Sequence, residues 1–126
     1  MGNIKVSIDQ NRQVTIHEVV GFITADEVIS AFEEFASKSP TQYLLWDFSG
    51  AEVSSITSDG LRKIVSVGKT KAHLRPGGKT ALLVSGDLEF GIARMYEMLA
   101  EVHDHPIRHR IFTAKEEAIN WLLSGE

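Results

Sequence analysis

The segment Ser54-Ser55-Ile56-Thr57-Ser58-Asp59-Gly60-Leu61 places hydroxyl groups and one carboxylate immediately before an amphipathic run. This combination suits nucleophilic catalysis, phosphorylation of a hydroxyl, or capping of a helix. Thr57 or Ser58 can cap a helix by accepting a hydrogen bond from an amide of its first turn. Asp59 then lies in that turn, where the helix dipole favours negative charge, and Gly60 permits close backbone approach. On residue chemistry alone, capping explains the segment.

Catalytic interpretations of the chain lack the spacing that each would need. A serine hydrolase requires Gly-x-Ser-x-Gly at a strand-to-helix turn, and that pattern does not occur. Gly77-Gly78-Lys79-Thr80 resembles the end of a phosphate-binding loop, but His73 stands where the pattern needs a glycine. Asp47 follows a buried run, as the phosphoacceptor of a receiver domain does, but the acid pair that would hold magnesium is missing. We therefore expect no enzymatic activity and no cofactor.

A histidine-rich connection contains metal-ligating residue types. His103, Asp104, His105 and His109 are of the kinds that bind zinc or copper. Their spacing on a Pro-containing loop fixes no coordination geometry, and two arginines lie among them. We expect a charged, solvated connection and no metal site.

Composition limits the class of protein. The 126 residues suffice for one domain with its own core, residues 1–126. Cysteine is absent, which excludes disulfides, zinc-thiolate sites and cysteine nucleophiles. No apolar run approaches the roughly 20 residues of a membrane span, and the N-terminus has no signal-peptide core. The expected protein is cytoplasmic, without a membrane span.

Charge is unevenly distributed along the chain. The formal net charge of −4 argues against nucleic acid as a partner. Between Gly60 and Gly86 there is no acid but there are six cations, which are Arg62, Lys63, Lys69, Lys71, Arg75 and Lys79. This segment is either one basic face or an ordinary solvated helix and loop.

Periodicity predicts the elements that position these residues. Residues 4–8 and 14–20 indicate an antiparallel hairpin. A helix follows the capping box Thr24-Ala25-Asp26-Glu27, and the apolar run 43–48 is typical of a strand covered on both faces. A second helix then begins near Thr57, and a second buried strand occupies residues 80–84.

The remaining elements continue the alternation of strands and helices. A third helix opens at Asp87, with Ile92, Tyr96, Leu99 and Val102 expected inward. A short strand at 111–112 and a second capping box, Thr113 to Glu116, lead to a terminal helix. The pattern predicts an α/β fold with a mixed sheet of about five strands, opening with a hairpin and packed with about four helices.

Several segments in this order resemble the STAS domain family, whose best-known members are bacterial anti-sigma-factor antagonists. They are Asp47-Phe48-Ser49-Gly50, the cluster ending in Gly60-Leu61, the run 77–84 (GGKTALLV) and the run 111–118 (IFTAKEEA). The helix EFGIARMYEML and the ending EAINWLL are most similar to the small bacterial SpoIIAA-like subgroup.

The resemblance implies a non-enzymatic regulatory domain that binds a protein partner, such as a kinase or an anti-sigma-like regulator. The family's hallmark is Asp-Ser-Ser-Gly-Leu at this helix start, and a partner kinase phosphorylates its second serine. Carried over, the motif's aspartate is Thr57, its first serine is Ser58 and its phosphorylated serine is Asp59. Either Asp59 is a permanent, partial mimic of the phosphate, with about one negative charge against 1.5–2, or Ser58, Ser55 or Ser54 is the acceptor.

The predicted partner surface comprises Asp47, Ser54, Ser55, Thr57, Ser58, Asp59, Gly60, Arg62 and Lys63. The subgroup's grouping with CRAL-TRIO-type lipid-transfer domains implies an alternative, a small apolar ligand or lipid. Its pocket would lie between helices and sheet, with aromatics that otherwise form ordinary core, such as Phe22, Phe32, Phe35, Phe90, Tyr96 and Trp121. A third alternative is a homodimer, because hairpins at sheet edges invite pairing.

Overall fold

The computed structural model describes residues 2–125, which form a five-stranded sheet, four α-helices and one short 3₁₀ helix. The strands are β1 (Asn3–Asp9), β2 (Val14–Phe22), β3 (Tyr43–Glu52), β4 (Lys79–Leu83) and β5 (Arg108–Phe112). The helices are α1 (Ala25–Ser37), α2 (Ser58–Lys71), α3 (Asp87–Val102) and α4 (Lys115–Leu123), with the 3₁₀ turn at Ala72–Leu74. The predicted α/β architecture is confirmed.

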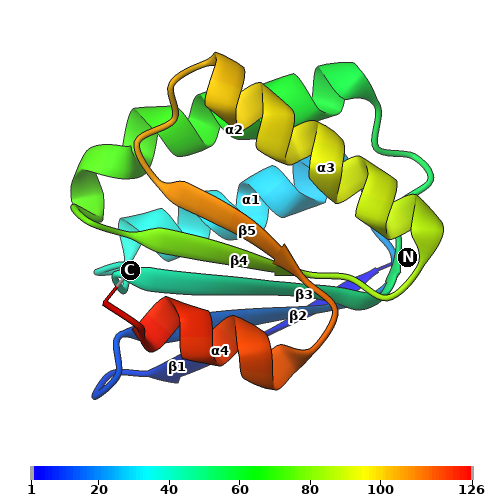
Figure 1. The fold of residues 1–126 in the computed structure, drawn as a ribbon. Coiled ribbons are helices and arrows are strands. Elements are labelled where there is room, and N and C mark those ends of the chain that lie inside the picture. Colours follow the sequence, from blue (N-terminus) through cyan, green and yellow to red (C-terminus); the bar gives the residue numbers. More distant parts are fainter. Residues whose placement is uncertain (1, 126) are drawn as a thin grey trace.

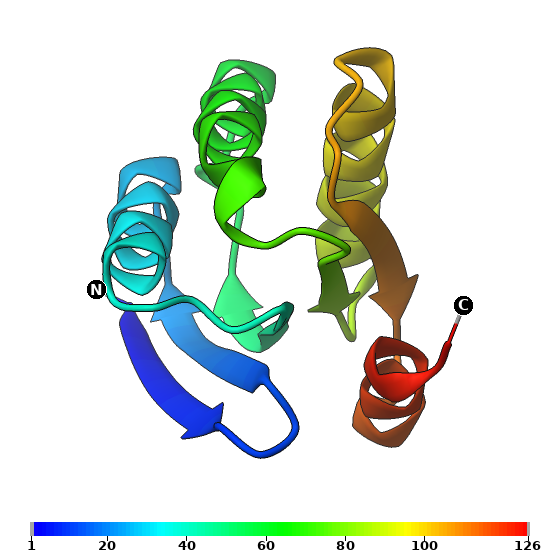
Figure 2. The same ribbon diagram turned by 90° about the vertical axis from the view of Figure 1, so that its left-hand side faces the viewer.

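The strands lie in the sheet in the order in which they occur along the chain (Figure 1). β1 and β2 form the predicted antiparallel hairpin, whereas β2, β3, β4 and β5 are parallel. Three crossovers that all step in one direction place α1, α2 and α3 on one face of the sheet, because such connections are right-handed. Figure 2 shows these helices side by side above the sheet and α4 below it.

Two apolar cores lie on the two faces of the sheet, and β3 contributes to both. Leu44 and Trp46 pack in the core beneath α1, α2 and α3. Leu45 packs in the smaller core that Ala118 and Leu122 of α4 complete. This two-sided burial explains why β3 reads as a continuous apolar run.

The first turns of α1 and α4 show whether the two predicted capping boxes form. At α1, Thr24 Oγ1 accepts from the amide of Glu27, while Glu27 Oε1 accepts from the amide of Thr24, so the predicted capping box is confirmed. The second predicted box, at Thr113, is wrong. α4 begins after Ala114 with no side-chain cap.

Two other details depart from the expectations. Val102, predicted to face inward, is 73% exposed at the last turn of α3. β3 continues to Glu52, beyond the expected apolar run, because Val20, Gly21 and Phe22 of β2 extend alongside it. Within residues 2–125, no helix combines the length and apolar character needed to cross a membrane.

Candidate functional site

The start of α2 is the centre of the predicted partner surface, and Thr57 is its N-cap. Thr57 Oγ1 accepts a hydrogen bond from the amide of Gly60 at 3.1 Å, so Thr57, rather than Ser58, caps the helix. Ser58 is the first helical residue and is exposed. The local sequence therefore fixes where the helix begins and which side chains lie in its first turn.

Gly60 allows α2 to pack closely against α1. A Cβ at this position would lie only 2.9 Å from Cβ of Ala25, the first residue of α1. The two helix starts are therefore adjacent on the same face of the sheet (Figure 2). This contact holds the first turn of α2 in place and leaves its outer side accessible.

Asp59 and Arg62 form an exposed ion pair on that outer side. Arg62 Nη1 lies 2.8 Å from Asp59 Oδ1, and the Asp59 side chain is 87% exposed. Lys63 is exposed beside them. An exposed pair of this kind contributes about 0.2–1 kcal/mol, so a partner can separate the two charges at little cost.

Ser54 and Ser55 precede the cap and differ in what they bind. Ser55 Oγ donates to the carbonyl of Ile23 at 3.1 Å, which ties the β3–α2 connection to the end of β2. Ser54 Oγ lies 3.3 Å from Glu52 Oε1, near the limit of a hydrogen bond. The Ser54 hydroxyl is therefore held less firmly than that of Ser55.

Asp47 lies apart from the other predicted site residues. Leu44 and Trp46 face the α1–α3 side of the sheet, so strand alternation places the side chain of Asp47 on the opposite, α4 side. It is buried and accepts hydrogen bonds from the amide and hydroxyl of Ser49, at 2.9 and 2.6 Å. These two bonds link the Asp47 side chain to the extension of β3.

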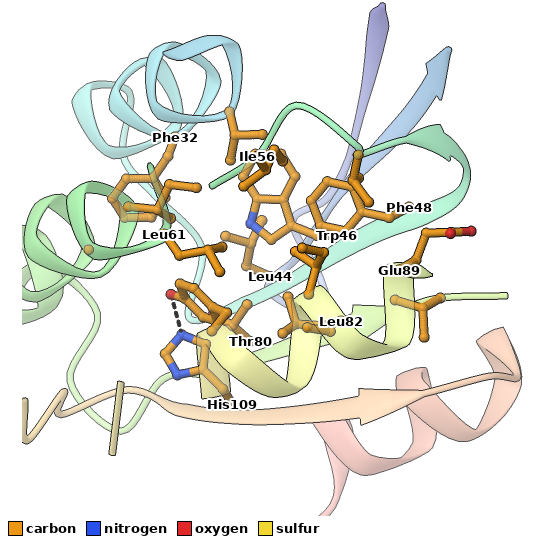
Figure 3. A pocket seen from close by; sticks show the side chains of 18 of the residues that line it. Phe32, Leu44, Trp46, Phe48, Ile56, Leu61, Thr80, Leu82, Glu89 and His109 are labelled. Carbon is orange, nitrogen blue, oxygen red and sulfur yellow. Dashed lines mark hydrogen bonds between the residues drawn. The ribbon is translucent and has the colours of Figure 1, made fainter. Parts of the chain in front are cut away.

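A cavity lies between the sheet and the helices α1, α2 and α3, where the alternative of a small apolar ligand or lipid expects its pocket (Figure 3). Of the aromatics expected around a pocket, Phe32 and Tyr96 line it. Phe22 and Phe90 are exposed instead. Trp121 packs on Phe112 in the core beneath α4, and Phe35 packs against His17.

One end of the cavity is polar, and its histidines come from the connection predicted to be solvated. Tyr96 OH lies 3.0 Å from His109 Nε2, and the rings of His105 and His109 are in edge contact at 4.7 Å. Burial lowers the pKa of His105 to about 4 and that of His109 to about 3. Burial also raises the pKa of the Tyr96 hydroxyl. All three side chains are therefore neutral near pH 7.

A buried arginine completes this end of the cavity. Arg75 is only 4% exposed, and its guanidinium donates to the carbonyls of Thr41, Gln42 and Lys79 and to the hydroxyl of Thr80. Burial lowers the pKa of Arg75 to about 10, so it stays charged at neutral pH. Lys79 is buried as well, so the basic segment does not form one continuous surface.

The strand register contains the signal for the histidines. Ile107, His109 and Ile111 alternate along the chain, as residues on one face of a strand do. β5 begins at Arg108, earlier than predicted, and carries His109 inward with Ile111. Among residues 2–125, no group of three or more metal-ligating side chains is arranged to hold an ion.

Solved structures, but no family model or curated protein, are similar to this chain. No protein-family model matches the sequence, and no curated protein matches it. An anti-sigma factor antagonist from Mycobacterium paratuberculosis is similar with a TM-score of 0.67 and 16% identity, over 98% of this chain and 96% of that chain.

Two further structures have the same fold. An uncharacterized DUF3478-family protein with a SpoIIAA-like fold from Shewanella loihica gives a TM-score of 0.60 at 16% identity, over 96% of this chain and 93% of that chain. The phosphorylated form of the Bacillus cell fate determinant SpoIIAA gives 0.54 at 12% identity, over 94% and 98%. The chain thus has the SpoIIAA-like, STAS-type fold that the sequence resemblance predicted.

Proposed function

We propose that this protein is a non-enzymatic regulatory domain that binds a protein partner through the first turn of α2 and the connection before it. The observation that carries the proposal is the exposed Asp59–Arg62 pair, held at the start of α2 by the Thr57 cap and by the close packing of Gly60 on α1. The fold of anti-sigma factor antagonists supports a role in regulation.

Asp59 gives this surface a fixed negative charge. Its carboxylate needs no kinase, and its one negative charge is about half of that on a phosphate. The pair with Arg62 offsets part of this charge until a partner engages one of the two residues. We infer that partner binding is constitutive rather than switched at this position, with Asp47 outside the interface.

A charge reversal at this position tests the surface. The partner is first captured from the native host with the wild-type protein, and its affinity is then measured with purified components. Asp59→Lys should weaken binding by about tenfold or more, because it replaces the fixed negative charge of this surface with a positive charge that a complementary partner repels.

Glu116→Lys is the matched control. Glu116 is also exposed and also lies in the first turn of a helix, but α4 is on the opposite face of the sheet. If the two charge reversals change the affinity for the partner equally, or if Asp59→Lys does not change it, the first turn of α2 is not the partner surface.

Two other partners stay predictions. β1 is an edge strand with Val6 and Ile8 exposed, which would suit pairing with a second copy of the chain. Sedimentation at several concentrations tests this. The other is a small apolar ligand or lipid, and the cavity of about 80 Å³ limits how much of such a ligand it can enclose.

A further inference from the structure

The cavity beneath α2 and α3 has one apolar wall and one charged end. Its volume is about 80 Å³. Most of its lining is apolar and comes from β3, β4 and the facing sides of the helices, including Leu44, Trp46, Leu61, Leu82 and Ile92 (Figure 3). Such a space excludes a charged ligand unless a charge of opposite sign meets it.

Arg75 supplies a positive charge that no acid in the lining neutralises nearby. Glu89 is the one carboxylate of the cavity wall, and Figure 3 shows it at the opposite end from His109. Arg75 uses Nε and Nη2 in its hydrogen bonds, all to carbonyl or hydroxyl oxygens. Its Nη1 donates to none of residues 2–125, and Arg75 is among the residues that line the cavity.

Neutral polar groups lie beside this cation. His105 Nδ1 accepts from the amide of Ile107 at 3.1 Å, so in the neutral ring the proton is on Nε2. That nitrogen lies against Gly68 of α2, where a Cβ would approach it to 2.7 Å. The Tyr96 hydroxyl, paired with His109, is the third polar group at this end.

We propose that this cavity binds a short-chain monocarboxylate. Its carboxylate lies at the end formed by Arg75, Tyr96 and His105, and its alkyl chain lies against the apolar wall. A guanidinium matches a carboxylate in shape and charge, whereas a neutral ligand would leave the buried charge without a counter-ion.

The volume sets the length of the ligand. A cavity of about 150 Å³ accommodates benzene, so about 80 Å³ holds a molecule of roughly half that size. Benzene has six non-hydrogen atoms, so acetate, with four, comes near this limit, whereas propionate, with five, and a fatty acid exceed it. The inference is independent of the proposed partner surface, because binding is measured on the purified protein alone.

Acetate and acetamide form a matched pair of probes, since they share their shape and differ in charge. Titration of methyl-labelled protein, followed by NMR, should give saturable shifts of the Leu61 and Ile92 methyl groups with acetate, together with intermolecular NOEs. Acetamide should bind about tenfold or more weakly, because it lacks the ionic contact with Arg75.

Two variants locate the site. Ala93 lines the cavity and is buried, so Ala93→Leu should fill the space and abolish binding while the protein stays folded. Arg75→Met should remove the preference for acetate over its amide. Arg94→Met, on the exposed side of α3, is the control and should bind as wild type does.

Three results would overturn the proposal. They are equal, non-saturating shifts with the two probes, unchanged binding to Ala93→Leu, and a preference for the carboxylate that survives Arg75→Met. If Arg75→Met does not fold, the comparison of the two probes and the Ala93→Leu variant still decide the matter.

Discussion

Replacement of His17 should make the protein less sensitive to acid. His17 is 1% exposed, stacks on Trp46 with ring centroids 4.2 Å apart, and meets the edge of Phe35. Its Nδ1 is buried and has no hydrogen-bond partner among residues 2–125. The imidazole therefore behaves as an aromatic core residue that carries an uncompensated polar atom.

The pKa of His17 gives the size of the effect. Burial lowers it from 6.5 to about 4. The unfolded chain thus takes up a proton before the folded protein does, so stability is complete above pH 6.5 and falls as the pH decreases towards 4. At about 1.4 kcal/mol per pH unit, this one group reduces the free energy of unfolding by about 2 kcal/mol between pH 7 and pH 5.

His17→Phe removes the titrating group and keeps the ring stacking. The groove between β1 and α1, which His17 also lines, leaves room for the larger ring. At pH 7 the variant should be at least as stable as wild type, because an unpartnered buried polar atom costs about 1–3 kcal/mol. The difference in unfolding free energy should then increase by about 2 kcal/mol at pH 5.

Urea unfolding at pH 5, 6 and 7 measures this difference. For a slope of about 2 kcal/mol/M, the gap between the two midpoints should widen by about 1 M over this range. His105 and His109 titrate in both proteins, so the gap isolates residue 17. The exposed His73, changed to Gln, is the control. Parallel stability curves for wild type and His17→Phe would refute the reasoning.

Two further predictions concern hydrogen bonds. Thr57→Ala should lower the free energy of unfolding by about 1 kcal/mol, because it removes the side-chain cap of α2. Thr113→Ala is the control and should change that free energy little, since α4 has no side-chain cap. Equal losses for the two variants in urea unfolding would contradict this prediction. Tyr96→Phe should cost about 1–3 kcal/mol, because it leaves the buried His109 Nε2 unpaired, and unchanged His109 ring ¹⁵N shifts would show that the bond does not form.

Local patterns predicted the elements well because short-range chemistry determines them. The box at Thr24 and the cap at Thr57 depend on residues three apart in the chain, and both form as expected. The same pattern at Thr113 fails. The N-cap of α4 is Ala114, in extended conformation, one residue after Thr113. The capping pattern alone gives no reason to prefer one of these two adjacent positions as the N-cap.

The site was less predictable because its parts depend on long-range packing. Strand alternation places the side chain of Asp47 on the face of the sheet away from α2. The sequence of β3 does not reveal this, because the strand is apolar on both faces and the pattern does not indicate which residues face which helix. Arg75 is charged and so was grouped with surface cations, although carbonyls of the β3 and β4 segments bind it. His109 faces inward only because β5 begins at Arg108.

The one-sided arrangement of α1, α2 and α3 has a consequence for synthesis of the chain. These helices emerge from the ribosome interleaved with the strands, so their face of the sheet can be covered as it forms. The other face stays uncovered until α4 follows the last strand. Until α4 docks, the newly made chain therefore carries Val14, Leu45 and Leu83 as exposed apolar surface. Docking of α4 is the step at which chaperone binding or aggregation competes with folding.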